Sequence, residues 1–305
     1  MQVERDWAEA LIDKRIALTG ASGLIGRSVR ALWAALELPA PIILSGDARA
    51  PAVYDAQFDC LIHLAGVGPS RFARDFSEAM AINVQGVQQA LTACARQDAT
   101  LIFISTSGVY APLDVHALRE DDPIEPPRAY GESKYIGERL CRAWWTEQSV
   151  PVKILRLFNV YGAYQSADLL PGYVLQQAVS GEPIALKTPQ AQRDFLHADD
   201  AARAILSACA QSWEGFDLFN VGEGVSRSVA EFVETLERVM GRALPQERQP
   251  ADDANEQDEV SQFRADITRI HNALGWSPSL DLEAGLRRTL QQMGVETVEE
   301  SEEAD

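Results

Sequence analysis

An α/β fold with a doubly wound parallel sheet is predicted by three features of the sequence. Short apolar stretches with the composition of buried strands alternate with segments in which apolar residues recur at helical spacing. The first such stretch, residues 16–18, runs directly into Gly20, Gly23 and Gly26, and a helix predicted over residues 28–38 follows. With 305 residues, of which 46% are hydrophobic, the chain is long enough to bury a full core. We therefore expect one large α/β unit or two closely joined domains.

The turn between the first strand and the first helix is typical of a Rossmann-type dinucleotide-binding unit. In its Gly-x-x-Gly-x-x-Gly spacing, Gly20 permits a tight turn and Gly23 lets the backbone approach a pyrophosphate. Gly26 lets the helix pack close to the strand, and the helix N-terminus presents free N–H groups to phosphate. The alternative is an ordinary strand-to-helix turn, which the flanking strand and amphipathic helix disfavour. We expect cofactor contacts from Gly20, Ser22, Gly23, Leu24 and Ile25.

The end of the second predicted strand, residues 41–44, lies where such a fold meets the adenosine ribose. Ser45, Asp47 and Arg49 follow this strand and are candidate cofactor contacts. An acidic side chain there accepts a hydrogen bond from the ribose 2′-hydroxyl and favours NAD, whereas a basic side chain favours NADP. Because Asp47 and Arg49 favour opposite cofactors, the sequence leaves NAD and NADP open.

Residues 59–66 predict a further buried strand that ends in small residues. We expect it beside the first strand, where Leu64, Ala65 and Gly66 would close the cofactor cleft. His63 is interpreted as a histidine packed within the strand rather than as a ligand. The segment that precedes this strand is much shorter than the ~30 residues of a βαβ unit. The sheet should therefore lack one strand–helix excursion at this point, or carry it much reduced.

Strands and helices alternate along the remainder of the chain and lead into a smaller C-terminal lobe. Strands are predicted at residues 101–104, 152–157 and 217–222. Helices are predicted at residues 76–97, 130–145, 169–181, 201–211 and 229–240, with a final helix within residues 266–292. We assign residues 1–165, with 194–224, to the dinucleotide-binding domain. Residues 166–193 and 225–295 are assigned to the smaller lobe, and residues 296–305 are expected to form an acidic, disordered tail.

The composition argues against several classes of function. A formal net charge of −18 at pH 7 disfavours nucleic-acid binding, which requires a basic surface. Cys60, Cys94, Cys141 and Cys209 are widely spaced and predict reduced, buried thiols. The four histidines show no ligand spacing, so no metal site is expected. Because neither a leader nor an apolar run of membrane-spanning length is present, we expect a soluble, cytoplasmic protein that does not bind membranes.

Tyr130 and Lys134 are four residues apart at the start of a predicted helix and share one face of it, although an ordinary amphipathic helix could carry such a pair. Thr106, with Ser105 and Ser107 as alternatives, follows a strand at the sheet edge where α/β proteins bind ligands. Hydride transfer between an alcohol and a nicotinamide also moves the hydroxyl proton, and a nearby ammonium lowers a tyrosine pKa from ~10. We predict Tyr130 as general acid/base, Lys134 as the pKa-lowering and ribose-binding cation, and Thr106 as partner of the substrate hydroxyl.

The sequence resembles the extended short-chain dehydrogenases/reductases, and among them the NAD-dependent epimerase/dehydratase family that acts on nucleotide sugars. The resemblance extends over nearly the whole chain. Its motifs are TGASGLIG (19–26), IHLAG (62–66), NVQG (83–86), STSGVY (105–110), YGESK (130–134), RLFNVYG (156–162), RDFLHADD (193–200), FNVG (219–222) and LGWSP (274–278). In this family the helices that contain Asn83 and Tyr130 usually form a four-helix dimer interface, so the resemblance implies a homodimer.

The resemblance also implies roles for individual residues in binding a nucleotide-sugar substrate. The family's catalytic Ser/Thr position selects Thr106. Asn159 matches an asparagine that contacts the substrate phosphates, and Arg193 matches an arginine near the diphosphate, a partner that suits a guanidinium. Leu170 lies in a segment that matches one lining the nucleotide base. Arg248 matches only loosely a second phosphate-binding arginine of the family.

Two positions depart from branches of this family. Sugar 4,6-dehydratases carry Asp-Glu directly after the catalytic Thr, and the decarboxylating branch carries Glu where Gly108 stands, whereas this chain has Ser107 and Gly108. The resemblance therefore implies a 4-epimerase or 4-ketoreductase that uses NAD or NADP, with Ser107 among its substrate-binding residues. A reductase of a small ketone or aldehyde is a second hypothesis. A non-catalytic NAD(P)-sensing regulator is a third, although it would have no need for Tyr130 and Lys134.

Overall fold

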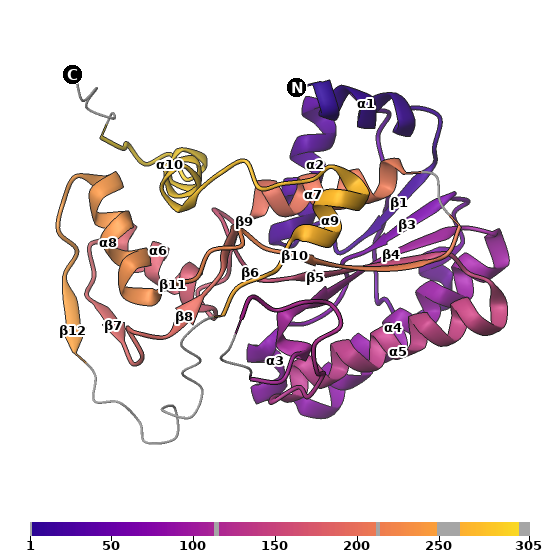
Figure 1. Cartoon of the computed structure of the whole chain (residues 1–305), viewed down its shortest axis with the longest axis horizontal. Helices are drawn as coiled ribbons and strands as arrows, with labels where there is room; N and C mark the ends of the chain where they lie inside the picture. Colours follow the sequence, from indigo (N-terminus) through magenta and orange to yellow (C-terminus); the bar gives the residue numbers. More distant parts are fainter. Residues whose placement is uncertain (1, 113–115, 212–213, 249–262, 299–305) are drawn as a thin grey trace.

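The predicted parallel sheet is the centre of the computed structural model, which describes residues 2–112, 116–211, 214–248 and 263–298. Its six strands are β1 (Ile16–Thr19), β2 (Ile42–Leu44), β3 (Cys60–His63), β4 (Thr100–Thr106), β5 (Val152–Leu157) and β10 (Phe216–Val221). They are hydrogen-bonded in the order β10-β5-β4-β3-β1-β2, and every pairing is parallel (Figure 1). The α/β, doubly wound fold class is thereby confirmed.

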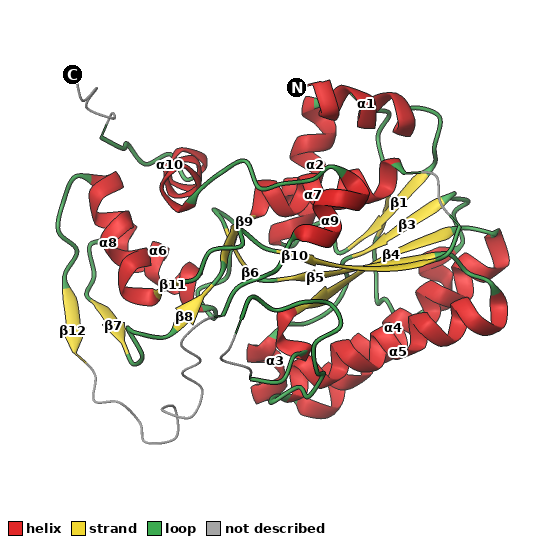
Figure 2. Ribbon diagram, in the orientation of Figure 1, coloured by secondary structure: helices red, strands yellow, loops and turns green. Residues whose placement is uncertain are grey.

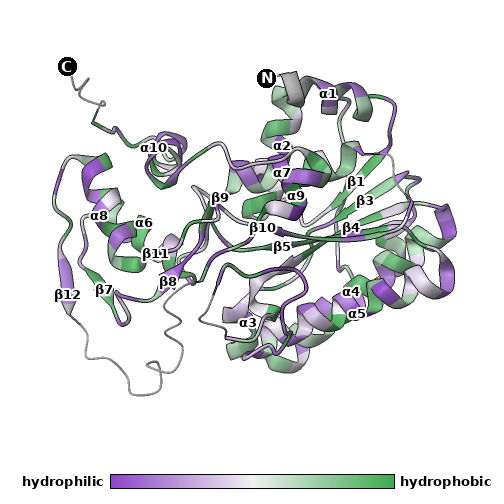
Figure 3. Cartoon of the chain, viewed as in Figure 1, coloured by the Kyte–Doolittle hydropathy of each residue, from purple (hydrophilic) through white to green (hydrophobic). Residues whose placement is uncertain are grey.

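Helices cover both faces of the sheet (Figure 2). One layer consists of α1 (Gln2–Leu11), α2 (Leu24–Ala35), α7 (Ala198–Ala210) and α9 (Thr268–Leu274), and the other of α4 (Phe76–Gln97) and α5 (Ala129–Gln148). Successive residues of a strand point to opposite faces, so Ile16 and Leu18 pack in the first layer and Ala17 in the second. Several strands of the sheet are largely apolar (Figure 3), and β1, β3 and β5 are buried along their whole length, which explains why short apolar runs identified them.

The segment between β2 and β3 is reduced, as predicted. It contains a single 3-10 helix, η1 (Pro51–Tyr54), where a further strand and helix would otherwise stand. Tyr54 and Phe58 are buried here and pack with residues of α4 on the second face of the sheet. The shortened chain therefore closes the sheet edge without an additional strand, and β2 remains the edge strand beside β1.

A smaller lobe with its own apolar core lies beside the carboxyl ends of the strands (Figure 1). Its elements are α6 (Leu170–Ser180), β7 (Ile184–Leu186), β8 (Gln192–Arg193), β11 (Arg227–Ser228), α8 (Val229–Met240), β12 (Gln246–Arg248) and α10 (Leu282–Gln292). The remaining short elements are α3 (Pro69–Arg74), η2 (Ser107–Val109), β6 (Asn159–Tyr161) and β9 (Phe195–His197). The exact division into two domains remains a prediction. Val298 donates its backbone N–H to the carbonyl of Val239, and residues 299–305 of the predicted tail lie outside the described part.

Several expected helices differ from the structure. Helix α2 begins at Leu24, directly after Gly23, and ends at Ala35, whereas it was expected over residues 28–38. The final helix expected within residues 266–292 is α10, but a further helix, α9, precedes it; Gly275 ends α9 at a φ of 63° and the buried Trp276 follows. The Trp276 indole N–H donates to the carbonyl of Asp200 at 3.2 Å, which ties this connection to α7. Helix α7 itself begins at Ala198, earlier than expected, because the His197 side chain accepts the backbone N–H of Asp199 at 3.1 Å.

Candidate active site

Two adjoining cavities open at the carboxyl ends of the parallel strands, where open α/β sheets bind ligands. The inner cavity, about 450 Å³, contains Thr106, Tyr130 and Lys134 in its wall. The outer cavity, about 810 Å³, contains Asp47 and Arg49 in its wall. Both are lined by the same four residues at their junction, Gly20, Gly23, Leu64 and Gly66. The predicted glycine turn therefore lies between the predicted catalytic residues and the predicted ribose-binding residues.

The glycine turn leaves space for a ligand at one position and none at another. Gly20 has a φ of 68°, and a Cβ atom there would lie 2.7 Å from the Ala65 nitrogen, so only glycine fits between this turn and the chain after β3. A Cβ atom on Gly23 would meet nothing closer than the Gly20 carbonyl oxygen at 3.5 Å. Because Gly23 is also the N-cap of α2, the open space beside it faces the free N–H groups of that helix. This arrangement fits a pyrophosphate.

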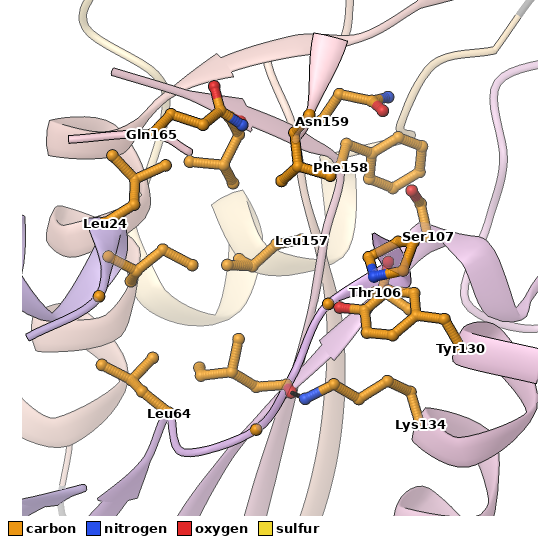
Figure 4. A pocket seen from close by; sticks show the side chains of 18 of the residues that line it. Leu24, Leu64, Thr106, Ser107, Tyr130, Lys134, Leu157, Phe158, Asn159 and Gln165 are labelled. Carbon is orange, nitrogen blue, oxygen red and sulfur yellow. Dashed lines mark hydrogen bonds between the residues drawn. The ribbon is translucent and has the colours of Figure 1, made fainter. Parts of the chain in front are cut away.

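The predicted catalytic side chains come from two elements and meet in the inner cavity (Figure 4). Tyr130 and Lys134 extend from the first turns of α5, and Thr106 is the last residue of β4. A hydrogen bond joins the side chains of Tyr130 and Thr106. The Lys134 ammonium donates to the carbonyl of Ile104 at 2.9 Å, and a Cβ atom on Gly66 would lie 3.5 Å from Lys134 Nζ. The lysine therefore reaches the junction of the two cavities.

The pKa values of these groups correct one expectation. Burial raises the pKa of Tyr130 to about 12, and the hydrogen bond with Thr106 only partly opposes this. Burial lowers the pKa of Lys134 to about 8, while the negative charge of Glu138 acts in the opposite direction. We expected Lys134 to lower the pKa of Tyr130, but the protein's own groups do not produce that result, because desolvation of the phenolate dominates. Tyr130 is therefore protonated at neutral pH and carries a proton that it can donate.

Asn83 links the chain after β3 to the start of α5. Its Oδ1 accepts the backbone N–H of Val67 at 2.8 Å, and its Nδ2 donates to Ser133 Oγ at 3.0 Å. Ser133 Oγ in turn donates to the carbonyl of Tyr130 at 2.7 Å. Since Asn83 is buried on α4, these bonds fix the tyrosine-bearing turn relative to the cofactor side of the cavity.

A second buried network lies behind Thr106 and Lys134. Glu138, one turn after Lys134 on α5, accepts hydrogen bonds from Ser105 Oγ at 2.5 Å and from Arg156 Nη2 at 2.7 Å. The side chains of Arg156 and Glu138 are only 4% and 5% exposed, so both charges depend on each other for compensation. Ser105, an alternative for the catalytic hydroxyl, is thus engaged with Glu138, and the hydrogen bond to Tyr130 favours Thr106 for that role.

The predicted substrate-binding residues with described side chains also line the inner cavity. Ser107, Asn159, Leu170 and Arg193 lie in its wall on four different elements. Asn159 Nδ2 is buried and has no hydrogen-bond partner within the described residues, so it is a donor that a ligand can satisfy. Arg248 is described only by its backbone, which pairs with Leu186 in β12 and β7, and its side chain lies outside the described part.

Gln165 lines the inner cavity but was not predicted. Its Nε2 donates to the carbonyl of Val160 at 2.9 Å, and its buried Oε1 lacks a partner among the described residues (Figure 4). Val67, Pro69, Leu157 and Phe158 were likewise missed. No pattern in the sequence signals these residues, because they lie at or just beyond the ends of strands, where the tertiary structure decides which side chains face the cavity.

The remaining predicted cofactor contacts lie in the walls of one or both cavities. Leu24 and Ile25 line the inner cavity, and Ser22, Ser45 and Ala65 line the outer one. His63 is a packed strand histidine, as predicted. Its Nδ1 lies 3.1 Å from Thr19 Oγ1, its ring stacks on Phe103, and burial lowers its pKa to about 3.

Four further properties concern acidic side chains, metal ligands, membranes and cysteines. No Asp or Glu is present among the described residues that line the inner cavity. In the same described part of the chain, no group of three or more His, Cys, Asp or Glu side chains is placed to hold a metal ion. A search of these residues also finds no helix whose length and apolar character would carry it across a membrane. All four cysteines are buried free thiols.

Comparison with known proteins places this geometry in a family. Residues 16–222 match the model of the NAD dependent epimerase/dehydratase family. The chain belongs to this family. The family match confirms the expected membership of the extended short-chain dehydrogenases/reductases and the expected class of nicotinamide-dependent enzyme. The name of the family gives NAD as the cofactor. The matched segment contains the whole central sheet and every predicted catalytic and cofactor-binding residue.

Relatives in this family differ in the reactions for which they are named. The chain is 26% identical to GDP-6-deoxy-D-mannose reductase of Pseudomonas aeruginosa over 91% of its own length and 96% of that protein. It is also 26% identical to UDP-glucuronic acid decarboxylase 1 of Danio rerio, but spans only 58% of that relative's length. The structure of UDP-glucuronic acid 4-epimerase from Bacillus cereus, in complex with UDP-glucuronic acid and NAD, matches 92% of this chain and 99% of that one, with a TM-score of 0.78 and 25% identity.

Proposed function

We propose that this protein is an NAD(P)-dependent nucleotide-sugar 4-epimerase or 4-ketoreductase. One observation carries the proposal. Thr106, Tyr130 and Lys134 line a single cavity, and the wall of that cavity also contains the glycine turn, Asn159 and Arg193. The first three suit proton transfer at a sugar oxygen, and the last two suit a diphosphate. Relatives named for nucleotide-sugar reactions support the same substrate class.

Each of these residues has a distinct task in the proposed reaction. The open space at Gly23 would hold the pyrophosphate of NAD(P), with Lys134 toward its nicotinamide ribose. Bound nicotinamide supplies or accepts the hydride at the sugar C4. Tyr130, which is protonated at neutral pH, would donate its proton to the 4-keto oxygen as the alcohol forms. In an epimerase the first half-reaction would instead start from the tyrosinate, which takes the proton of the 4-hydroxyl group and returns it in the second half. The Thr106 hydroxyl, already hydrogen-bonded to Tyr130, holds the same sugar oxygen in line.

The inner cavity disfavours two other reactions found among the relatives. A 4,6-dehydratase needs an acid and a base for the elimination of water, and carboxyl groups are the usual choice. The described wall of the inner cavity contains no carboxyl group, and Ser107 and Gly108 stand where dehydratases carry Asp and Glu. The glutamate of the decarboxylating branch is also absent, because Gly108 stands at its position. Epimerisation or reduction at C4 would require from the protein only hydroxyl groups and a lysine, which are present, while a bound dinucleotide would accept or supply the hydride.

Turnover of defined substrates tests this function. The purified protein is incubated with UDP-glucose, UDP-N-acetylglucosamine and dTDP-4-keto sugars, with NAD, NADH or NADPH, and products are separated by chromatography. Conversion of one of these sugars to its 4-epimer or to the reduced sugar would support the proposal. If no nucleotide sugar reacts while the protein reduces a small ketone or aldehyde, the second hypothesis replaces it.

Arg193 separates these two alternatives in a single variant. In an enzyme for nucleotide sugars, Arg193→Ala should raise KM about 100-fold, because a charge-assisted contact to phosphate is lost, and should change kcat little. Reduction of a small ketone should remain nearly unchanged. Arg242→Ala, which removes an arginine that does not line either cavity, is the matched control. Equal loss of both activities in Arg193→Ala would indicate a structural role and contradict the assignment.

The cofactor that remains after purification separates the two proposed reactions. An epimerase returns its hydride to the same sugar and should retain NAD through purification, whereas a reductase must exchange its cofactor in every cycle. Acid extraction followed by chromatography measures the bound dinucleotide per chain. Near-stoichiometric NAD would favour the epimerase, and a protein isolated without cofactor that consumes NADH or NADPH would favour the reductase.

We also propose a homodimer formed through α4 and α5, as the resemblance implies. These helices lie side by side on one face of the sheet (Figure 1). Apolar side chains such as Val84, Leu140 and Trp144 are only partly buried within one chain. A second copy would cover more of this surface. Sedimentation velocity of the purified protein would show one species of twice the chain mass, and a monomer at micromolar concentration would contradict the proposal.

A further inference from the structure

The loop between β6 and α6 contacts two other segments that line the inner cavity. We call residues 162–169, which form this loop, the strap. Gln165 and Leu169 of the strap lie in the wall of the inner cavity, together with the glycine turn before α2 and residues 66–69 at the start of α3. Figure 4 shows Gln165 on the same side of the cavity as Leu24. Three segments from distant parts of the chain therefore meet around this space.

An ion pair joins the strap to α3. Arg74, the last residue of α3, donates from Nη2 to both carboxylate oxygens of Asp168, each at 3.0 Å. The two residues are 94 positions apart in the sequence, and both side chains are exposed. An exposed ion pair is weak, breaks readily and is weakened further by salt. Such a pair is better suited to holding a movable segment than to stabilising the fold.

A cation–π contact joins the strap to α2. The Arg27 guanidinium carbon lies 5.1 Å from the centre of the Tyr164 ring. Arg27 directly follows Gly26 of the glycine turn, and its Nε donates to the carbonyl of Ser22 at 2.8 Å. This hydrogen bond fixes the arginine to the glycine turn, so Tyr164 is the partner that can move away. Because Tyr164 is exposed, the contact is also weak.

The strap is the more mobile side of these contacts, because α3 is anchored. Every residue of 163–168 is at least partly exposed, and the backbone N–H groups of Gln165 and Leu169 close two short turns within the strap itself. Helix α3 instead buries Phe72, whose ring packs edge-on against the Tyr130 ring at 6.1 Å. Segments with few buried contacts open at a low cost in free energy. Opening of the strap therefore leaves α3 and Tyr130 in place.

We propose that the strap is a gate over the inner cavity, held shut by the ion pair with α3 and the cation–π contact with α2, and that it limits how fast a dinucleotide enters and leaves. Opening breaks both contacts and moves Gln165 away from the space between the glycine turn and α3. Loop motions of this kind set the rate of ligand exchange in many enzymes. The inference concerns exchange of the cofactor in the family's name and does not depend on which sugar, or whether any sugar, is the substrate.

A gate held by contacts between protein groups has a kinetic signature. Arg27, Arg74, Tyr164 and Asp168 are not among the residues predicted to bind cofactor or substrate. Breaking their contacts should therefore speed binding and release by the same factor and leave the dissociation constant nearly unchanged. Loss of a direct ligand contact would instead speed release alone and weaken the affinity.

Stopped-flow fluorescence measures both rates without catalysis. The full chain, freed of bound dinucleotide, is mixed with NADH to give the binding rate, and its NADH complex is mixed with excess NAD to give the release rate. Asp168→Ala and Tyr164→Ala should each speed release about threefold, as expected for one weak exposed contact. The double variant should release NADH about tenfold faster, with the dissociation constant within about twofold of the unmodified protein.

Matched variants separate the gate from a general effect of lost surface charge. Arg119→Ala breaks an exposed ion pair with Asp266, outside the described walls of both cavities, and should leave the release rate unchanged. Tyr164→Phe keeps the ring and should retain slow release. Arg74→Glu and Asp168→Arg should each speed release, whereas their combination restores an ion pair of reversed order and should slow release again.

Three outcomes would overturn the proposal. An unchanged release rate in the double variant of Tyr164 and Asp168 would show that the strap does not limit exchange. Faster release with an unchanged binding rate would show that these residues hold the ligand itself. Fast release from the charge-reversed pair would exclude the ion pair as the closing contact. Thermal melting of each variant checks that the fold is retained, which is expected because the substituted side chains are exposed.

Discussion

The inner and outer cavities use charged side chains in opposite environments. In and behind the inner cavity, Lys134 and Glu138 are both buried, and burial has moved the pKa of the lysine to about 8. In the outer cavity, Asp47 is 48% exposed and its pKa is lowered to about 2 by Arg49. The comparison shows that burial makes a charged group titratable near neutral pH, whereas a solvent-exposed pair keeps both charges fixed. The inner cavity is therefore suited to proton transfer and the outer cavity to recognition.

The largest effect that tests this comparison is loss of the Tyr130 hydroxyl. Tyr130→Phe should reduce kcat about 10³–10⁴-fold, because the group that moves the proton is removed and the ring remains. Steady-state kinetics with the substrate found above measures this. Tyr135→Phe, on the same helix but outside the cavity walls, should keep nearly full activity. Full activity in Tyr130→Phe would contradict the proposed acid/base role.

A smaller effect should appear in the stability of the buried charges. Glu138→Ala should lower the free energy of unfolding by about 3 kcal/mol, because Arg156 is left buried without its partner. Asp168→Ala breaks an exposed ion pair, in which the Arg74 side chain is 64% exposed and the Asp168 side chain 41% exposed. This variant should lower the free energy of unfolding by less than about 1 kcal/mol. Urea denaturation measures both. Equal costs would mean that burial does not distinguish the two pairs.

The smallest expected effect is a pH dependence that belongs to the inner cavity. The Lys134 ammonium is present below its pKa of about 8 and is lost above it, so kcat/KM should fall about tenfold per pH unit once the pH exceeds that value. A profile from pH 6 to 10 measures this. Lys153, whose pKa burial also lowers to about 8, lines neither cavity, so Lys153→Met should keep the same falling limb. Constant activity up to pH 10 would contradict a role for the lysine charge.

Residues that form a local sequence pattern were predicted better than properties that depend on the folded surroundings of a side chain. Residues of the glycine turn were identified from their spacing, because the turn is continuous in sequence. Its glycines are required by the local backbone conformation, such as the φ of 68° at Gly20. Tyr130 and Lys134 were found for the same reason, since four residues make one helical turn. Gln165 was missed and Tyr130 was assigned the wrong direction of pKa shift, because both depend on what surrounds a side chain after folding.

The sequence by itself determined the order along the chain of the six sheet strands and the larger helices, the reduced segment before β3, and many of the residues that line the two cavities, because apolar periodicity and glycine spacing are local properties of the chain. Only the tertiary structure decided which charges meet. Arg49 is only two residues from Asp47 in sequence, but its second partner, Glu78, comes from α4, so only folding brings both carboxylates to one guanidinium. Burial and long-range pairing, which set the pKa values and the free hydrogen-bonding groups, exist only once distant segments pack together.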